Sequence, residues 1–244
     1  MNVLVVGAGA MGRWFARTVQ THADATVAFT DTDQSVAEAA ATAVSGRAVA
    51  SDATDTFDVV CVAVPMPVAE TAITEFAPLA TSAIVDVTGS MATPIAAMRE
   101  AMPDGQRLSL HPLFAPENAP GNVAVVTDSP GPDADVVVDA LSAAGNNCFE
   151  TTVTEHDEAM ETVQASAHAA VLAFSMAADD VPDRFQTPVS AGLFDLVEQV
   201  TGGDPRVYAD IQAAFDGADA VATAARELAD ADADTFERLY EQLS

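Results

Sequence analysis

The ten residues VLVVGAGAMG at positions 3–12 decide the fold. A β-branched run ends in three glycines at G-x-G-x-x-G spacing, and the helical pattern MGRWFARTVQ follows directly. The first glycine allows a tight turn, the second lets the backbone approach a pyrophosphate, and the third lets the helix pack closely on the strand. The start of that helix also offers unpaired N–H groups to an anion. We therefore predict a dinucleotide-binding turn made by Gly7, Gly9, Ala10, Met11 and Gly12; the alternative is a tight turn without a ligand.

Short β-branched runs alternate with Ala-rich amphipathic segments through the first half of the chain. Strands that are separated by helical patterns of ten or more residues imply βαβ units and a parallel sheet with both faces covered. We therefore predict an α/β fold, a Rossmann-like dinucleotide-binding domain over residues 1–151. The strand-like runs occupy residues 2–7, 25–31, 58–65, 82–88, 106–112 and 122–128.

After about residue 150 only helical patterns remain. Apolar residues recur at three-or-four spacing across EHDEAMETVQASAHAAVLAFSMA at 155–177. Further helices are expected at 189–201, 205–215 and 218–243. We predict an all-α domain over residues 152–244. Because so small a helical domain with apolar faces gains stability from a second copy, we expect a homodimer.

The composition bounds the partners and the compartment. The chain has nine Arg, no Lys and 37 acidic residues, for a net charge of −28. This excludes a nucleic-acid partner, which needs clustered cations, and it resembles the composition of cytoplasmic proteins of extreme halophiles. Cys61 and Cys148 stand in apolar contexts and predict buried thiols in a reducing cytoplasm. The apolar stretch at 59–69 is too short to span a bilayer, so no membrane partner is expected.

The second part of a dinucleotide signature is an acid about 20 residues beyond the glycines, at the end of the second strand. Asp31 stands there, where its carboxylate could accept hydrogen bonds from ribose hydroxyls. It favours NAD over NADP, whose 2′-phosphate would meet a negative charge with no arginine nearby. The alternative interpretation is a solvated turn acid. Val64 and Pro65 end a later strand, where this fold places the nicotinamide crevice.

Four polar residues are candidates for chemistry. Ser90 and His111 stand at the ends of two strand-like runs, while Gln164 and His168 lie four residues apart on one helix face. Both sets would border the cleft between the domains. A neutral imidazole, with a reference pKa of about 6.5, is well matched to accepting a substrate proton there. The alternatives are an ordinary strand-end histidine at 111 and a core histidine at 168.

Several motifs follow one another in a fixed order along most of the chain. They are GAGAMG (7–12), Asp31, AVP (63–65), D-x-x-G-S (86–90), LHPLF (110–114), EHDEAMETVQASAH (155–168), TP (187–188) and DPRVYADI (204–211). In this arrangement the chain resembles the prephenate/arogenate dehydrogenase family of tyrosine biosynthesis. The glycine motif is shared by many dehydrogenases, whereas the His-Pro pair and the H-D…Q-x-x-x-H helix are more specific together.

The resemblance implies an NAD-dependent oxidative decarboxylation of prephenate to 4-hydroxyphenylpyruvate, without a metal. Hydride leaves the ring carbon that bears the hydroxyl, CO2 departs, and the ring becomes aromatic. His111 would accept the hydroxyl proton, and Ser90 would bind the same hydroxyl or orient the imidazole. Gln164 and His168 would help bind the substrate.

Three positions depart from the family pattern. Gln199 replaces an Arg that grips a substrate carboxylate, Ala92 replaces a Lys, and Ala115 replaces a Gly. A dianionic substrate nevertheless needs a cation. Arg184, just before the matching TP, is the nearest candidate.

Three other functions therefore stay open. The substrate could be arogenate, or the chain could be another small-acid dehydrogenase or reductase of the same two-domain plan. Those related enzymes typically lack the His-Pro pair, and the 3-hydroxyacid enzymes use a Lys that this chain does not have. The third possibility is a non-catalytic nucleotide-binding protein that has lost its substrate arginine.

Overall fold

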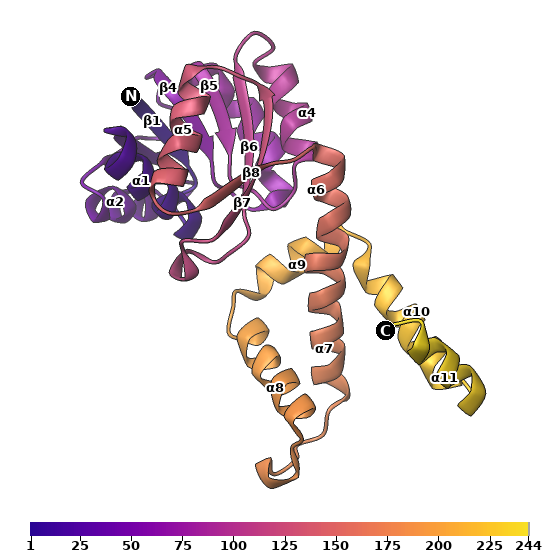
Figure 1. The fold of residues 1–244 in the computed structure, drawn as a ribbon. Coiled ribbons are helices and arrows are strands. Elements are labelled where there is room, and N and C mark those ends of the chain that lie inside the picture. The colour runs from indigo at the N-terminus through magenta and orange to yellow at the C-terminus, as the bar shows by residue number, and fades with distance from the viewer. Residues whose placement is uncertain (244) are drawn as a thin grey trace. The chain divides into compact units, whose positions relative to one another are not determined.

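The computed structural model describes residues 1–243 and divides into two compact units, Met1–Asp157 and the residues from Glu158 onward (Figure 1). The division falls within helix α6 (Val153–Met160), which begins in the first unit and ends in the second. The boundary expected at 151/152 lies just before this helix.

The first unit contains an eight-stranded sheet in the order β3-β2-β1-β4-β5-β6-β7-β8 (Figure 1). The strands are β1 (Asn2–Val6), β2 (Thr26–Thr30), β3 (Arg47–Ala48), β4 (Phe57–Val62), β5 (Ala80–Asp86), β6 (Gln106–Pro112), β7 (Asn122–Ser129) and β8 (Asn147–Glu150). The six predicted strands are all present. The strands pair in parallel as predicted, except that β7 runs antiparallel to β6. The short β6–β7 connection holds a single 3-10 turn, η3 (Pro116–Asn118), whereas a parallel crossover needs a longer segment.

Helices cover both faces of this sheet. On one side lie α1 (Ala10–Ala23), α2 (Gln34–Ala43) and α5 (Pro132–Ala143), and on the other α3 (Ala69–Phe76) and α4 (Ala92–Ala101). Alternation along β1 shows why both faces are apolar: Val3 and Val5 pack into one core, while Leu4 and Val6 pack into the other. The 3-10 turns η1 (Met66–Val68) and η2 (Ala77–Leu79) flank α3.

The strand order reverses between β1 and β4, since β1 pairs with β2 on one side and with β4 on the other. In open α/β sheets, ligands bind outside the carboxyl ends of the strands at such a switch point. The glycine turn follows β1 at this edge. The fold therefore positions the glycine turn for a nucleotide.

The second unit is helical (Figure 1). After α6 come a π-helical turn, η4 (Glu161–Ser166), and then α7 (Ala167–Ala177), η5 (Asp183–Phe185), α8 (Pro188–Thr201), α9 (Pro205–Ala214), α10 (Gly217–Asp230) and α11 (Ala233–Glu241). The single helix expected at 218–243 is two helices. Ala231 adopts an extended conformation after α10, and Asp232 then caps α11 by accepting a hydrogen bond from the N–H of Thr235.

The core of the second unit is thin. Among its described residues, the buried apolar side chains are Met160, Ala165, Val200, Ile211 and Phe215. Large apolar side chains are exposed in their place, including Met176 at 89%, Val189 at 75% and Phe185 at 65%. Within residues 1–243, no helix has the length and apolar character needed to cross a membrane.

Candidate active site

The glycine turn has the shape that a bound dinucleotide requires. Gly7 has a φ of +95°, and a Cβ on it would lie 2.3 Å from the carbonyl oxygen of Ala63. A Cβ on Gly12 would lie 2.1 Å from the carbonyl oxygen of Gly7. Gly9 is exposed and has no atom within 4 Å of its would-be Cβ, so open space lies before the N-terminus of α1. The Ala10, Met11 and Gly12 amides in the first turn of that helix can donate to a phosphate there.

Asp31 and Arg13 both bind Ala8, within the glycine turn. Oδ2 of Asp31 accepts from the Ala8 N–H at 2.8 Å, and Oδ1 accepts from the Asp33 N–H at 3.0 Å. Nη1 of Arg13 donates to the Ala8 carbonyl at 2.8 Å. Arg13 therefore contacts the same turn residue as Asp31, which the sequence analysis did not anticipate. The position of Arg13 directly after the third glycine is the sequence signal that could have found it.

Val64 and Pro65 follow β4 at the switch point. Cγ1 of Val64 lies 3.1 Å from the would-be Cβ of Gly7, so this segment packs directly on the glycine turn. Pro65 is exposed and precedes η1. Both residues are thus at the edge of the sheet where the cofactor was expected.

His111 is the penultimate residue of β6, as expected, and its side chain is buried. Its Nδ1 lies 2.8 Å from Nε2 of His156, and Nδ1 of His156 lies 2.7 Å from Oδ1 of Asp157. We call His111, His156 and Asp157 the histidine relay. The His156–Asp157 pair belongs to a motif of the family, but its role could not be predicted from the motif alone, because the contact with His111 joins residues far apart in the chain.

The carboxylate of Asp157 also holds the start of α4. Oδ1 accepts from the Met91 N–H and Oδ2 from the Ala92 N–H, each at 3.1 Å. These N–H groups belong to a helix terminus, where a negative charge is favoured. Although burial raises the pKa of Asp157, hydrogen bonds from His156 and from the two amides bring it below its ordinary value.

Burial and the neighbouring His156 lower the pKa of His111 to about 3, while Asp157 acts in the opposite direction. The neutral imidazole is therefore the resting form of His111 near neutral pH. A neutral imidazole can accept a proton, which is the state that a general base requires.

Ser90 lies on a turn that a buried carboxylate shapes. Oδ2 of Asp86 accepts hydrogen bonds from the N–H of Thr88 at 2.9 Å and from its hydroxyl at 2.5 Å. Burial raises the pKa of Asp86 to about 6, against the opposing effect of these bonds. Ser90 follows, half-buried, directly before Met91. Ser90 therefore adjoins the segment held by Asp157, at the carboxyl ends of neighbouring strands β5 and β6.

The other predicted site residues lie in the second unit. Gln164 is in the π-helical turn η4, a distortion that is frequent at functional sites. His168 is in the first turn of α7, and its ring centroid lies 4.9 Å from that of Tyr208, a residue the sequence analysis did not single out. Burial lowers the pKa of His168.

The proposed carboxylate-binding positions are exposed. Arg184 belongs to η5, with its guanidinium 4.9 Å from the centroid of the Phe185 ring. Gln199, at the family's arginine position, is exposed on α8. The structure does not identify the protein cation that binds the substrate's carboxylate, so Arg184 stays a prediction for that role.

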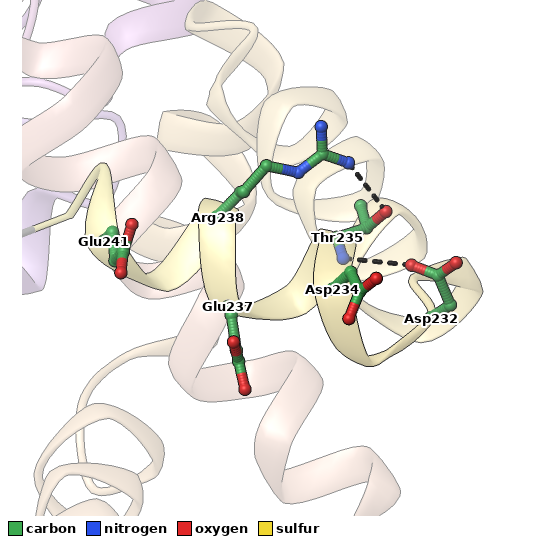
Figure 2. A pocket seen from close by; sticks show the side chains of 6 residues that line it. All are labelled: Asp232, Asp234, Thr235, Glu237, Arg238 and Glu241. Carbon is green, nitrogen blue, oxygen red and sulfur yellow. Dashed lines mark hydrogen bonds between the residues drawn. The ribbon is translucent and has the colours of Figure 1, made fainter.

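A surface hollow on α11 has no group of side chains comparable to the histidine relay (Figure 2). Arg238 donates to the Thr235 hydroxyl at 3.0 Å, and Figure 2 shows Glu237 directed to another side of the helix. Among residues 1–243, no three His, Cys, Asp or Glu side chains are grouped so as to hold a metal ion. The hollow is lined by Asp232, Asp234, Thr235, Glu237, Arg238 and Glu241.

Comparison with known proteins assigns the family. A family model described as the nucleotide-binding domain of prephenate dehydrogenase matches residues 15–129. A 4-amino-4-deoxyprephenate dehydrogenase from Streptomyces pristinaespiralis is 35% identical over 237 residues, covering 89% of this chain and 78% of the relative. The chain belongs to the prephenate dehydrogenase family. This membership confirms the dehydrogenase class and the nucleotide-binding first unit, and the expected use of NAD agrees with it.

More distant relatives agree with this assignment. A probable arogenate/prephenate dehydrogenase from Methanocaldococcus jannaschii is 26% identical over 170 residues, or 64% of this chain and 38% of the relative. The crystal structure of prephenate dehydrogenase from A. aeolicus, in complex with hydroxyphenyl propionate and NAD+, superposes with a TM-score of 0.75. That pair is 15% identical and covers 99% of this chain and 95% of the other. It confirms the Rossmann-like fold followed by a helical unit.

Proposed function

We propose that this prephenate dehydrogenase family member oxidatively decarboxylates a prephenate-like cyclic acid, with NAD as the hydride acceptor. The position of His111 carries the proposal. It is a buried neutral imidazole at the carboxyl edge of the sheet that also carries the glycine turn. Bound NAD would be the oxidant, accepting the hydride from the ring carbon that bears the hydroxyl.

The residues of the first unit would bind the cofactor and transfer the substrate's proton. The Gly9 to Gly12 amides and Asp31 bind the pyrophosphate and the adenosine ribose, and Arg13 adds a cation beside the turn. His111 accepts the substrate's hydroxyl proton as the C–O bond gains double-bond character. Ser90 hydrogen-bonds the same hydroxyl. When CO2 leaves, its bonding electron pair enters the ring, which becomes aromatic.

Arg13 gives a direct test of the cofactor site. We expect Arg13→Ala to raise the Kd for NAD about tenfold, because it removes a charge-assisted contact beside the phosphates. Arg17→Ala, an exposed position on the same helix, is the matched control. Isothermal titration with NAD compares the two variants, and equal Kd values for both would remove Arg13 from the site.

Substrate binding falls to residues of the second unit. Gln164 and His168 hydrogen-bond the substrate, and Arg184 neutralises one of its carboxylates. The chain's net charge of −28 makes such a cation necessary for an anionic ligand. Arg184→Ala should raise KM with little change in kcat, whereas Arg226→Ala, on α10, should change neither.

A second candidate substrate carries an amino group in place of the ring hydroxyl. The relative at 35% identity is a 4-amino-4-deoxyprephenate dehydrogenase, while the relative named for arogenate and prephenate is 26% identical. The chemistry of this alternative is parallel, since His111 would take the proton from nitrogen as the hydride leaves.

We also propose a cytoplasmic homodimer adapted to high salt. The exposed apolar side chains of the second unit, among them Met176, Phe185 and Val189, would be buried against a second copy. High salt would screen the repulsion between two chains of charge −28, because the Debye length falls to about 3 Å near 1 M. Sedimentation as a monomer in molar KCl would contradict the dimer.

The deciding experiment follows NADH absorbance in molar KCl with prephenate, arogenate and 4-amino-4-deoxyprephenate in parallel. The substrate with the largest kcat/KM identifies the ring substituent and the side chain that the site accepts. Measurable NAD binding without turnover of any of the three would overturn the proposed function.

A further inference from the structure

Building on the proposed function, we propose that His156 and Asp157 are positioning residues that fix the tautomer of His111. In this arrangement Nε2 of His111 is the atom that accepts the substrate's proton. Both residues act through another side chain and need no contact with substrate.

The tautomer follows from the order of donors and acceptors along the relay. The ionised carboxylate of Asp157 can only accept, so the 2.7 Å contact requires a proton on Nδ1 of His156. In the proposed relay His156 is the neutral imidazole, whose lone pair is then on Nε2. That atom accepts, across 2.8 Å, from Nδ1–H of His111. The neutral His111 imidazole consequently carries its lone pair on Nε2.

Burial makes this order effective. His111 is 6% exposed and His156 is 3% exposed, so water does not readily replace either partner. The two rings meet edge to face, with their centroids 5.0 Å apart and an angle of 71° between their planes. This packing holds the orientation of the His111 ring as well as its proton.

Asp157 connects the base to the neighbouring serine segment. Its two oxygens bind the Met91 and Ala92 amides, which directly follow Ser90. The same carboxylate therefore fixes the start of α4 and, through His156, the base on β6. Its negative charge also stabilises the positive charge that His111 gains on accepting a proton.

Two substitutions separate this role from simple packing. His156→Ala leaves Nδ1–H of His111 buried without its acceptor, and we expect kcat to fall on the order of 10²-fold while the Kd for NAD stays within twofold. His156→Gln restores the order, because its Oε1 can accept from His111 and its NH2 group can donate to Asp157. We expect it to recover most of the lost kcat. His22→Gln, at an exposed site on α1, is the matched control.

The tautomer is measured directly by ¹⁵N NMR of histidine-labelled protein without substrate. The chain has four histidines, so single variants assign the spectrum. We expect a protonated Nδ1 and an unprotonated Nε2 on His111 in the wild type and in His156→Gln, with a mixture in His156→Ala. This readout is independent of activity.

Either of two results overturns the proposal. One is a proton on Nε2 of wild-type His111, the state that a positively charged His156 would impose. The other is a kcat in His156→Gln as low as in His156→Ala. Absence of turnover by the wild type with every substrate defeats the proposed function instead, and the NMR spectrum still decides the tautomer.

Discussion

The two units of this chain bury their apolar residues to very different extents. In the first unit, both faces of the sheet are covered and strands such as β1 and β4 are almost wholly inaccessible. In the second unit, a few side chains are buried and Met176, Val189 and Tyr240 remain largely exposed. The first unit can therefore hold a buried relay in one geometry, whereas the second has a smaller core and more exposed apolar surface.

The largest effect that tests this comparison belongs to the first unit. His111→Asn removes the proposed base and should lower kcat by about 10²- to 10⁴-fold, with an unchanged Kd for NAD because the glycine turn is untouched. Stopped-flow NADH absorbance and NAD titration measure the two quantities. Unchanged kcat would remove His111 from the base role.

The contrast in burial should also appear as a contrast in hydrogen exchange. We expect amides of α8, α10 and α11 to exchange at least about 10³-fold faster than those of β1 and β4 in dilute protein. Raising the protein concentration should slow exchange in the helices as dimers form, without affecting the strands. Equal protection of both units in the most dilute sample would contradict the comparison.

Substitution of Asp86 tests how much the burial of a negative charge lowers the stability of the first unit. Its pKa is raised from 3.8 to about 6, so the unfolded state loses its proton first and stability falls as pH rises across this window. Asp86→Asn removes that dependence. Relative to wild type, we expect its free energy of unfolding to increase by about 2.4 kcal/mol between pH 4 and pH 8.

Urea unfolding followed by the fluorescence of Trp14, the chain's single tryptophan, reports this change for the first unit. His111, whose pKa is lowered, imposes the opposite pH trend. That trend is common to both proteins and cancels in their difference. A difference that does not change with pH would show that Asp86 is ionised throughout.

The sequence predicted most of the first unit because its signals are local. The glycine spacing, the β-branched runs and the strand-end Asp31 are all visible within a few residues of one another. The direction of β7 and the partners of His111 depend on pairing between distant segments, and no periodicity contains that information. The contact of Arg13 with Ala8 is local but was missed, because helical patterning alone does not show where a long side chain bends back.

The second unit was less predictable for a related reason. Its helices were identified by spacing, but the break at Ala231 between α10 and α11 interrupts an otherwise helical run of Ala and Asp. The π-helical turn that holds Gln164 was also missed. Because few long-range contacts fix these helices within one chain, their local patterns do not show how their apolar faces are covered.

The smallest effect comes from a pair of matched helix caps, one in each unit. Asp33 caps α2 by accepting from the Ser35 N–H, and Asp232 caps α11 by accepting from the Thr235 N–H, each at 2.9 Å. Hydrogen bonds from Ser35 and from Thr235 lower the pKa of these two carboxyls, so both caps stabilise their helices above the ordinary carboxyl pKa and are lost as pH falls below it.

At pH 7, Asp33→Ala should lower the Tm reported by Trp14 by about 2–4 °C. Asp232→Ala should leave that Tm unchanged and only speed amide exchange in α11, because this helix unfolds without the first unit. An equal loss of Tm in both variants would show that the two units unfold together.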